Sequence, residues 1–291
     1  MNSTIFYTII SLSSLGIFFG VILFFVAKKF KVIEDPRIDE VNEALPAANC
    51  GGCGYPGCRS FAEACVKATD LDNLFCPVGG NKCMGEVAKI LGIEVVEKEA
   101  MVAVVRCNGS YQNRPRTSTY DGTTWCKIVH NLYAGETGCS FGCLGLGDCV
   151  KACKFDAIYI DEVTGLPVVN EEKCVSCGAC VKACPRQLIE LRLKGKASRR
   201  IFVCCSNTEK GGVARKNCVA TCIGCGKCVK VCPFGAIEMR ENLAYIDYKK
   251  CKLCRKCVAE CPTKAIHEIN FPPKKPKIES IAEIKTEETN Q

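Results

Sequence analysis

Three cysteine runs constrain this chain more than any other feature. Each run has the spacing C-x2-C-x2-C-x3-C-P, which is typical of chains whose thiolates hold iron–sulfur clusters. Neighbouring cysteines in such a run are poorly placed to pair with one another, so a disulfide framework is a weak interpretation. The three runs contain Cys174, Cys177, Cys180 and Cys184; Cys222, Cys225, Cys228 and Cys232; and Cys251, Cys254, Cys257 and Cys261.

The last two runs predict one two-cluster module of the bacterial ferredoxin type. In such a module the fourth cysteine of each run ligates the other cluster, which ties the two halves together. Residues 234–250 between the runs are expected to form a short helix, a hairpin and a turn. The predicted ligand sets are Cys222, Cys225, Cys228 and Cys261 for one [4Fe–4S] cluster, and Cys232, Cys251, Cys254 and Cys257 for the other.

The third complete run has an incomplete partner upstream. In "GCSFGCLGLGDCVKAC", residues 138–153, a leucine stands at the second ligand position, Leu146. The two modules align as an internal repeat, in which Cys139 corresponds to Cys218 and "VAVVRCNGS" resembles "RIFVCCSNT". The repeat predicts one complete set, Cys153, Cys174, Cys177 and Cys180, and one set that lacks a ligand, Cys143, Cys149 and Cys184.

Two alternatives fill the gap at Leu146. The favoured one is that Cys139, four residues before Cys143, becomes the fourth ligand of a [4Fe–4S] cluster. The other is a [3Fe–4S] cluster, which needs only three thiolates. Cys218 occupies the repeat position of Cys139 in a module that lacks no ligand, so Cys139 is also a candidate for a different site.

That different site would be a sixth cluster, in addition to the five that the other motifs predict. Its candidate ligands are cysteines outside the runs, and no particular set of four is favoured over the alternative of buried thiols. The unassigned residues are Cys107, Cys126, Cys204, Cys205 and Cys218, with Cys139 as a further candidate.

A separate four-cysteine motif precedes both modules. "CGGCGYPGC" is followed by a helical segment and then by a cysteine–proline pair, and its glycines would let the backbone turn tightly around a cluster. A zinc site is the weaker alternative. Cys65 and Cys83 are expected to be buried thiols. The predicted ligands are Cys50, Cys53, Cys58 and Cys76.

The N-terminus carries one long apolar segment. Residues 4–27 contain no charge, and a helix of that length would span about 36 Å, enough to cross the hydrocarbon core of a bilayer. "KKFK" follows at once, so the positive-inside rule places the residues from Lys28 onward in the cytoplasm. A cleaved signal peptide fits poorly, because a basic n-region and an A-x-A site are missing. The cysteines would then lie in a reducing compartment.

Composition limits the classes of cofactor and partner that the chain is expected to bind. The chain has 27 cysteines but only 2 histidines, which disfavours a Rieske centre or a histidine-rich metal site. The net charge of +8 favours acidic partners. Nucleic acid is not an expected partner, because an arginine-rich arm and zinc-finger spacing are absent. No dinucleotide fingerprint and no acid–base constellation is present, so the chain itself is expected only to transfer electrons.

These features predict an α+β chain with five regions. A transmembrane anchor occupies residues 1–30, and a small helical [4Fe–4S] domain occupies residues 31–96, here called the N-terminal cysteine domain. Two tandem ferredoxin-like modules follow, the first module at residues 97–198 and the second module at residues 199–270. Residues 271–291 form a polar, charged tail that is expected to be disordered.

The order of these features resembles the B-subunit family of the Rnf complex, the ion-translocating ferredoxin:NAD oxidoreductase of bacterial membranes. The resemblance rests on the anchor, on "CGGCGYPGC…FCPVGG" and on the ferredoxin motifs, and it extends to about residue 270. Shorter members of the family have one two-cluster module, whereas this chain has two, like the longer forms from anaerobes.

The resemblance implies a role. The protein would accept electrons from reduced ferredoxin and pass them to other subunits of the complex, with flow to NAD coupled to Na⁺ or H⁺ translocation. It would sit in the bacterial cytoplasmic (inner) membrane with its iron–sulfur domains on the cytoplasmic side. The competing interpretations are an iron–sulfur subunit of another membrane oxidoreductase, such as a hydrogenase or dehydrogenase, and a zinc-binding structural module.

Overall fold

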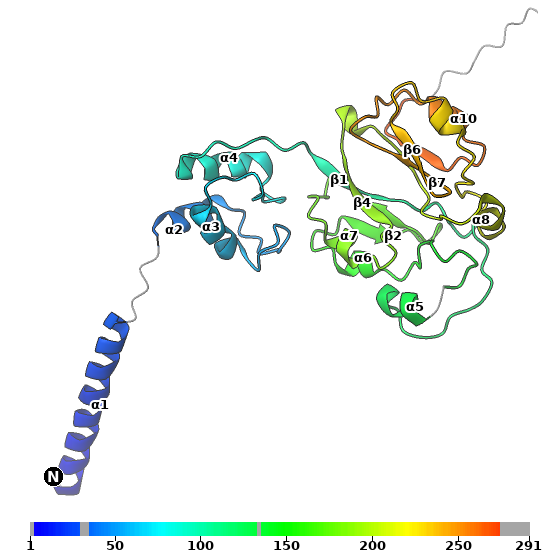
Figure 1. Ribbon diagram of the computed structural model, residues 1–291. Helices are drawn as coiled ribbons and strands as arrows, with labels where there is room; N and C mark the ends of the chain where they lie inside the picture. The colour runs from blue at the N-terminus through cyan, green and yellow to red at the C-terminus, as the bar shows by residue number, and fades with distance from the viewer. Residues whose placement is uncertain (1–2, 30–34, 133–134, 274–291) are drawn as a thin grey trace, which may run out of the picture.

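The computed structural model describes residues 3–29, 35–132 and 135–273 of the 291-residue chain. Most of the predicted tail, from residue 274 onward, lies outside the described residues. The first element is α1 (Ser3–Lys29), and its segment Phe6–Lys29 is long and apolar enough to cross a membrane. None of this segment is buried against the rest of the described chain, and Figure 1 shows α1 standing apart from the folded domains. The helix therefore has the exposed apolar surface that a membrane anchor requires.

The N-terminal cysteine domain is a small helical unit with its own core. Val41, Phe61 and Val87 come from three different helices and are almost completely buried. Burial of each such side chain contributes about 1.5–3 kcal/mol. The helical segment expected after "CGGCGYPGC" is present, and it begins at Cys58. The domain contains α2 (Arg37–Ala44), α3 (Cys58–Lys67) and α4 (Gly80–Leu91).

The two modules repeat one topology. In each module an outer antiparallel pair joins the first strand to the last, and an inner hairpin lies between them. Short helices follow the cysteine loops, so the strands hold these loops in place. The first module contains β1 (Met101–Val105), α5 (Cys126–Leu132), α6 (Asp148–Lys151), β2 (Ile158–Ile160), β3 (Pro167–Val169), α7 (Ala179–Ala183) and β4 (Ile189–Leu193).

The second module follows after a single 3₁₀ turn at Lys196–Ser198. It contains β5 (Arg200–Val203), α8 (Gly211–Asn217), α9 (Lys227–Lys230), β6 (Ile237–Arg240), β7 (Leu243–Ile246), α10 (Lys256–Glu260) and β8 (Ile266–Ile269). The predicted hairpin is β6–β7, but the helix expected at its start is not there. Pro233 and Phe234 form a turn, and Gly235 has a left-handed backbone with φ +57°, which a helix cannot include.

The two modules pack against each other through a shared interface. Val104, Phe202 and Cys204 form one buried cluster that draws on both modules. Arg192 of the first module is 1% exposed, donates to the Ile201 carbonyl at 3.4 Å and lies over aromatic rings of the second module. Figure 1 shows the strands of the two modules lying next to each other. This interface brings cysteines from different modules together.

Candidate iron–sulfur sites

Four of the predicted ligand sets are brought together by the fold. Two of them line cavities of their own. In each of the other two, one cysteine lies in a buried core and two more pack against that core, whereas Cys50 and Cys254 lie outside it. We name the sets by their position along the molecule. They are set A (Cys50, Cys53, Cys58, Cys76), set B (Cys153, Cys174, Cys177, Cys180), set E (Cys222, Cys225, Cys228, Cys261) and set F (Cys232, Cys251, Cys254, Cys257).

The incomplete set shares a cavity with a cysteine outside the runs. Cys143, Cys149 and Cys184 line one cavity, and the fourth thiol in its wall is that of Cys126, at the start of α5. We name these four residues set C. Cys139 is not in the wall of this cavity. The expectation that Cys139 fills the gap at Leu146 therefore differs from the geometry of the structure, which offers Cys126 instead.

Asp148 positions Cys126. This carboxylate is 8% exposed and directly precedes Cys149. Its two oxygens accept the backbone N–H groups of Cys126 at 2.8 Å and of Lys127 at 3.1 Å. A carboxylate that accepts free N–H groups at the first turn of a helix stabilises that end. Asp148 thus fixes the start of α5 beside Cys149, a positioning role that the cysteine spacing gave no reason to expect.

A loop insertion carries Cys126. The repeat-equivalent cysteines Cys107 and Cys139 are separated by 31 residues, whereas Cys205 and Cys218 are separated by 12. The longer loop contains α5, and Cys126 is its one cysteine. The length difference between the two repeats was therefore the available signal in the sequence.

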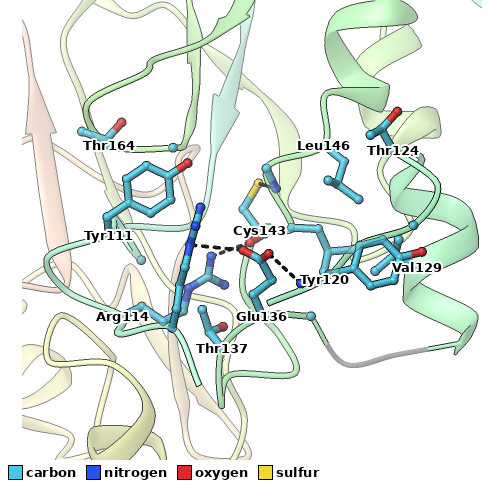
Figure 2. A pocket seen from close by; sticks show the side chains of 17 residues that line it. Tyr111, Arg114, Tyr120, Thr124, Val129, Glu136, Thr137, Cys143, Leu146 and Thr164 are labelled. Carbon is cyan, nitrogen blue, oxygen red and sulfur yellow. Dashed lines mark hydrogen bonds and ion pairs between the residues drawn. The ribbon is translucent and has the colours of Figure 1, made fainter. Parts of the chain in front are cut away.

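A cavity of about 220 Å³ lies where this insertion meets the Cys143 loop. Figure 2 shows Cys143 between Tyr111 and Leu146 in this view, with Glu136 in front. Glu136 accepts the Tyr120 N–H at 3.0 Å and forms an ion pair with Arg116 at 3.1 Å. These contacts join the early and late parts of the insertion to each other, and Arg114 of the insertion contacts the Cys143 carbonyl.

Cys139 belongs to a fifth cavity, at the interface between the modules. Its wall contains Cys107 and Cys139 of the first module and Cys205 and Cys218 of the second, which we name set D. The Asn207 amide of the second module lies 3.7 Å from Cys139 Sγ of the first. Cys107 and Cys139 of the first module are the repeat equivalents of Cys205 and Cys218 of the second. This pairing accounts for Cys218, which has no use inside its own complete module.

Cys204 also borders this cavity, but its contacts differ from those of a ligand. The Cys204 thiol donates to the Val105 carbonyl at 3.5 Å, and the side chain lies in the apolar interface. Cys205 Sγ instead accepts the N–H of the residue two positions later, Asn207, at 3.5 Å. We therefore place Cys205 in set D and Cys204 among the structural thiols.

The same N–H···S pattern recurs at other sites. The N–H of the residue two positions later lies 3.4 Å from the sulfurs of Cys50, Cys107 and Cys143. Such donors stabilise a thiolate, which is the form that ligates iron. Similar contacts reach the sulfurs of Cys76, Cys153, Cys184 and Cys261 at 3.3–3.4 Å.

Burial controls the charge of these thiols. It raises the pKa of Cys149 to about 12 and that of Cys228 to about 11, and neighbouring ligand cysteines add to both shifts. Several thiols cannot all ionise in one buried site without a cation to balance them. Among the described residues, no three histidine, cysteine or carboxylate side chains converge closely enough for a single ion. In sets B to E the cysteines line cavities instead, a donor arrangement that fits [4Fe–4S] clusters.

Two arginines lie between set C and set D. Arg114 donates to the Cys143 carbonyl at 2.6 Å, and Arg186 donates to the Gly142 carbonyl at 2.5 Å. A Cβ atom at Gly142 would lie 2.1 Å from the Arg114 guanidinium, so a larger residue there would displace this side chain. Burial lowers the pKa of Arg186, and the positive charge of Arg114 lowers it further. The two cations thus face the loop that separates the two sets.

Cys65 and Cys83 are buried, as the sequence predicted for structural thiols. Burial raises the pKa of Cys65 to about 12. The Cys83 thiol donates to the Ala44 carbonyl at 3.3 Å, and its side-chain hydrogen-bond contact with Cys76 lowers the pKa of Cys76 to about 6. Gly79 is needed at this point, because a Cβ atom there would lie 2.4 Å from the Cβ of Cys83. Cys83 therefore supports a ligand rather than acting as one.

Consecutive sets are in contact along the molecule. A Cβ atom at Gly52, beside set A, would lie 2.8 Å from the Cβ of Cys177 in set B. Sets B and C share the crossed runs of the first module, and sets E and F share those of the second. The Cys143 N–H of set C lies 3.4 Å from Cys107 Sγ of set D. Cys205 Sγ of set D lies 3.4 Å from the hydroxyl of Thr221, the residue before Cys222.

Family models match the same regions. A model described as a 4Fe-4S dicluster domain matches residues 138–188 and 221–265, and a 4Fe-4S double cluster binding domain matches residues 173–235. A model described as a putative Fe-S cluster matches residues 45–73. The fold, the cysteine sets and these matches define a multi-cluster iron–sulfur electron-transfer protein with one helix suited to a membrane.

Similar proteins identify the family. The chain is 43% identical to the B-subunit of the Na⁺-translocating ferredoxin:NAD⁺ oxidoreductase complex of Acetobacterium woodii, over 81% of this chain and 70% of the relative. It is 43% identical to the B-subunit of the ion-translocating oxidoreductase complex of Methanosarcina acetivorans, over 91% of this chain and 99% of the relative. For the B-subunit of the proton-translocating ferredoxin:NAD⁺ oxidoreductase complex of Clostridium ljungdahlii, the identity is 37% over 86% of both chains.

The chain belongs to the B-subunit family of ion-translocating oxidoreductase complexes. It is therefore an iron–sulfur electron-transfer component of a membrane complex of this kind, and the other subunits of that complex are its partners.

Proposed function

We propose that the chain holds six [4Fe–4S] clusters, one in each of sets A to F, and that none of the sites is a three-iron site. Twenty-four of the 27 cysteines then have a ligand role, and Cys65, Cys83 and Cys204 remain structural. Cys126 takes the position left by Leu146, and Cys139 serves set D. Bound clusters would supply one-electron redox chemistry at each set. The outer strand pairs support module limits at residues 97–198 and 199–270.

The observation that carries this proposal is the unbroken order of the sets. Set D lies between the modules and takes two ligands from each, so it closes the gap between set C and set E. Without it, the two modules would be separate pairs of sites. With it, the cysteines form one series from set F in the second module to set A in the N-terminal cysteine domain.

The series supports a direction for electron transfer. We infer that the chain accepts electrons from reduced ferredoxin at the second module and delivers them from set A to the membrane subunits. Set A is closest in the chain to α1, with only residues 30–49 between α1 and its first cysteine. Delivery to NAD, coupled to Na⁺ or H⁺ translocation, would then take place in other subunits. The lysines after α1 favour the cytoplasmic side of a bacterial inner membrane for the cysteine domains.

A single ligand variant tests the exit site. In the assembled complex, Cys53→Ala should leave the two modules reducible by ferredoxin but abolish transfer to the membrane subunits. The matched control is Cys65→Ala, which removes a buried thiol of the same domain that is not a ligand. Undiminished ferredoxin-dependent NAD reduction by the Cys53→Ala complex would contradict the proposed exit through set A.

A further inference from the structure

The net charge of the chain is concentrated in one module. Residues 199–270 contain 14 lysines and arginines but only 6 aspartates and glutamates, a balance of +8. The whole chain also has a net charge of +8, so the remaining residues are neutral in sum. A field of one sign on one part of a molecule attracts an oppositely charged partner to that part. The second module is therefore the part of the chain suited to an acidic partner.

The densest part of this charge surrounds one cysteine of set F. The segment "KKCKLCRK", residues 249–256, contains five cations and no carboxylate. Arg255 is neutralised by its ion pair with Glu268 at 2.5 Å, and its guanidinium also donates to the Pro272 carbonyl. The four lysines are exposed, and among the described residues none of them forms an ion pair. They are Lys249, Lys250, Lys252 and Lys256.

Cys254 lies within this group and is accessible. Of the 27 cysteines, only Cys225 and Cys254 are exposed. Lys252 and Lys256 flank Cys254 at two residues on either side, whereas Lys227 is the one cation within three residues of Cys225. Of the two exposed cysteines, Cys254 therefore has more cations beside it in the sequence. A partner that docks there would approach set F directly.

The first module shows how the equivalent position is used. Cys177 is the repeat equivalent of Cys254, and the N-terminal cysteine domain reaches it through Gly52. The surrounding segment "EKCVSCGA", residues 172–179, carries one cation and one carboxylate. In the first module this edge is therefore already a contact between two cysteine sets, and it is neutral. In the second module the same edge is exposed, and it is basic.

We propose that the four lysines around Cys254 form the docking surface for a small acidic electron-carrier protein of the ferredoxin class. This inference rests on the proposed function and assigns the uptake of electrons to one edge of set F. The carrier takes the place at the second module that the N-terminal cysteine domain takes at the first. Complementary charge mainly raises the association rate and makes binding dependent on salt.

Paired charge reversals test this surface. The full chain, loaded with clusters and purified without oxygen, would be titrated with an acidic two-cluster ferredoxin at several salt concentrations. Lys252→Glu/Lys256→Glu should weaken binding by about tenfold or more at low salt and flatten its salt dependence. The control Lys210→Glu/Lys216→Glu changes the charge equally, at exposed positions of the same module, and should stay within about twofold of the wild type. Iron content and the visible spectrum would show that both variants keep their clusters.

The possible outcomes distinguish a failure of the proposed docking surface from a failure of the proposed function. Equal weakening by both pairs would overturn the surface, because only the overall field would matter. Ferredoxin that binds and reduces all variants alike would overturn it too, but would leave the proposed function standing. Ferredoxin that neither binds nor reduces the wild type would overturn both. If Lys252→Glu/Lys256→Glu lost binding to phosphatidylserine vesicles but kept its ferredoxin affinity, the lysines would serve a membrane surface and the proposal would fail.

Discussion

The two modules share one topology but direct their cations to different places. In the first module, Arg114 and Arg186 point inward and donate to the loop between sets C and D. In the second module, the unpaired lysines are exposed around Cys254. The first module has 13 basic and 11 acidic residues, compared with 14 and 6 in the second. Under the proposed function, one module serves as an internal connector and the other presents a surface for a partner.

The modules also differ in how their ligand sets are completed. The second module needs only its own runs, whereas the first has Leu146 in place of a cysteine and supplies Cys126 through an insertion. Set D belongs to neither module alone, because each contributes two cysteines. The comparison shows that cysteines of both modules line one cavity at the interface, which the proposed function makes the link between the modules.

The largest effect is expected when the modules are disconnected. Cys205→Ala/Cys218→Ala removes both set D ligands of the second module and should lower the iron content by about four per chain, because the two remaining thiolates do not hold a cluster. Reduction of set A by ferredoxin should become far slower, while sets E and F stay reducible. Stopped-flow absorption measures both. The control Cys204→Ala should keep the wild-type iron content, and equal iron in both variants would contradict the assignment of set D.

A smaller effect is expected in set C. Cys126→Ala should convert its cluster to a three-iron form, with a loss of about one iron per chain and a new signal of the oxidised cluster in electron paramagnetic resonance. The double variant Cys126→Ala/Leu146→Cys restores the run found in the second module and should recover the four-iron cluster. If Cys139→Ala rather than Cys126→Ala produced the three-iron signal, Cys139 would be the replacement ligand after all.

The smallest expected effect is a shift in the reduction potential of a cluster in set C or set D. Arg114→Gln removes a positive charge between sets C and D and should lower a midpoint potential there by about 40 mV, because an electrostatic interaction of about 1 kcal/mol is lost. Redox titration followed by electron paramagnetic resonance would measure the shift. Arg116→Gln provides the control, since Arg116 is paired with Glu136 at the surface of the insertion. Equal shifts in both variants would show that the position of the charge does not matter.

Four of the ligand sets could be predicted from the spacing of cysteines along the chain. Sets A, B, E and F follow from short runs, and so does the crossing of the fourth cysteines, because three of four ligands lie within a few residues of each other. The N-terminal helix and the β6–β7 hairpin are also set by local patterns. Cys126 could not be assigned in this way, because it lies 17 residues before Cys143 and is placed by Asp148.

Set D was the hardest site to predict from the sequence. Its ligands span residues 107 to 218 and converge only when the two modules pack through Val104, Phe202 and Arg192. Long-range packing of this kind leaves no spacing pattern. The repeat alignment did pair Cys139 with Cys218, so the symmetry of the site was present in the sequence although its assembly was not.

The count of clusters tests the central claim most directly. Iron and acid-labile sulfide would be measured per chain on the full protein, purified without oxygen and reconstituted. Six [4Fe–4S] clusters predict about 24 irons and about 24 sulfides. A value of about 20 for both would mean that one of the six sets binds no cluster, and it would contradict the continuous series if the missing cluster proved to be that of set D.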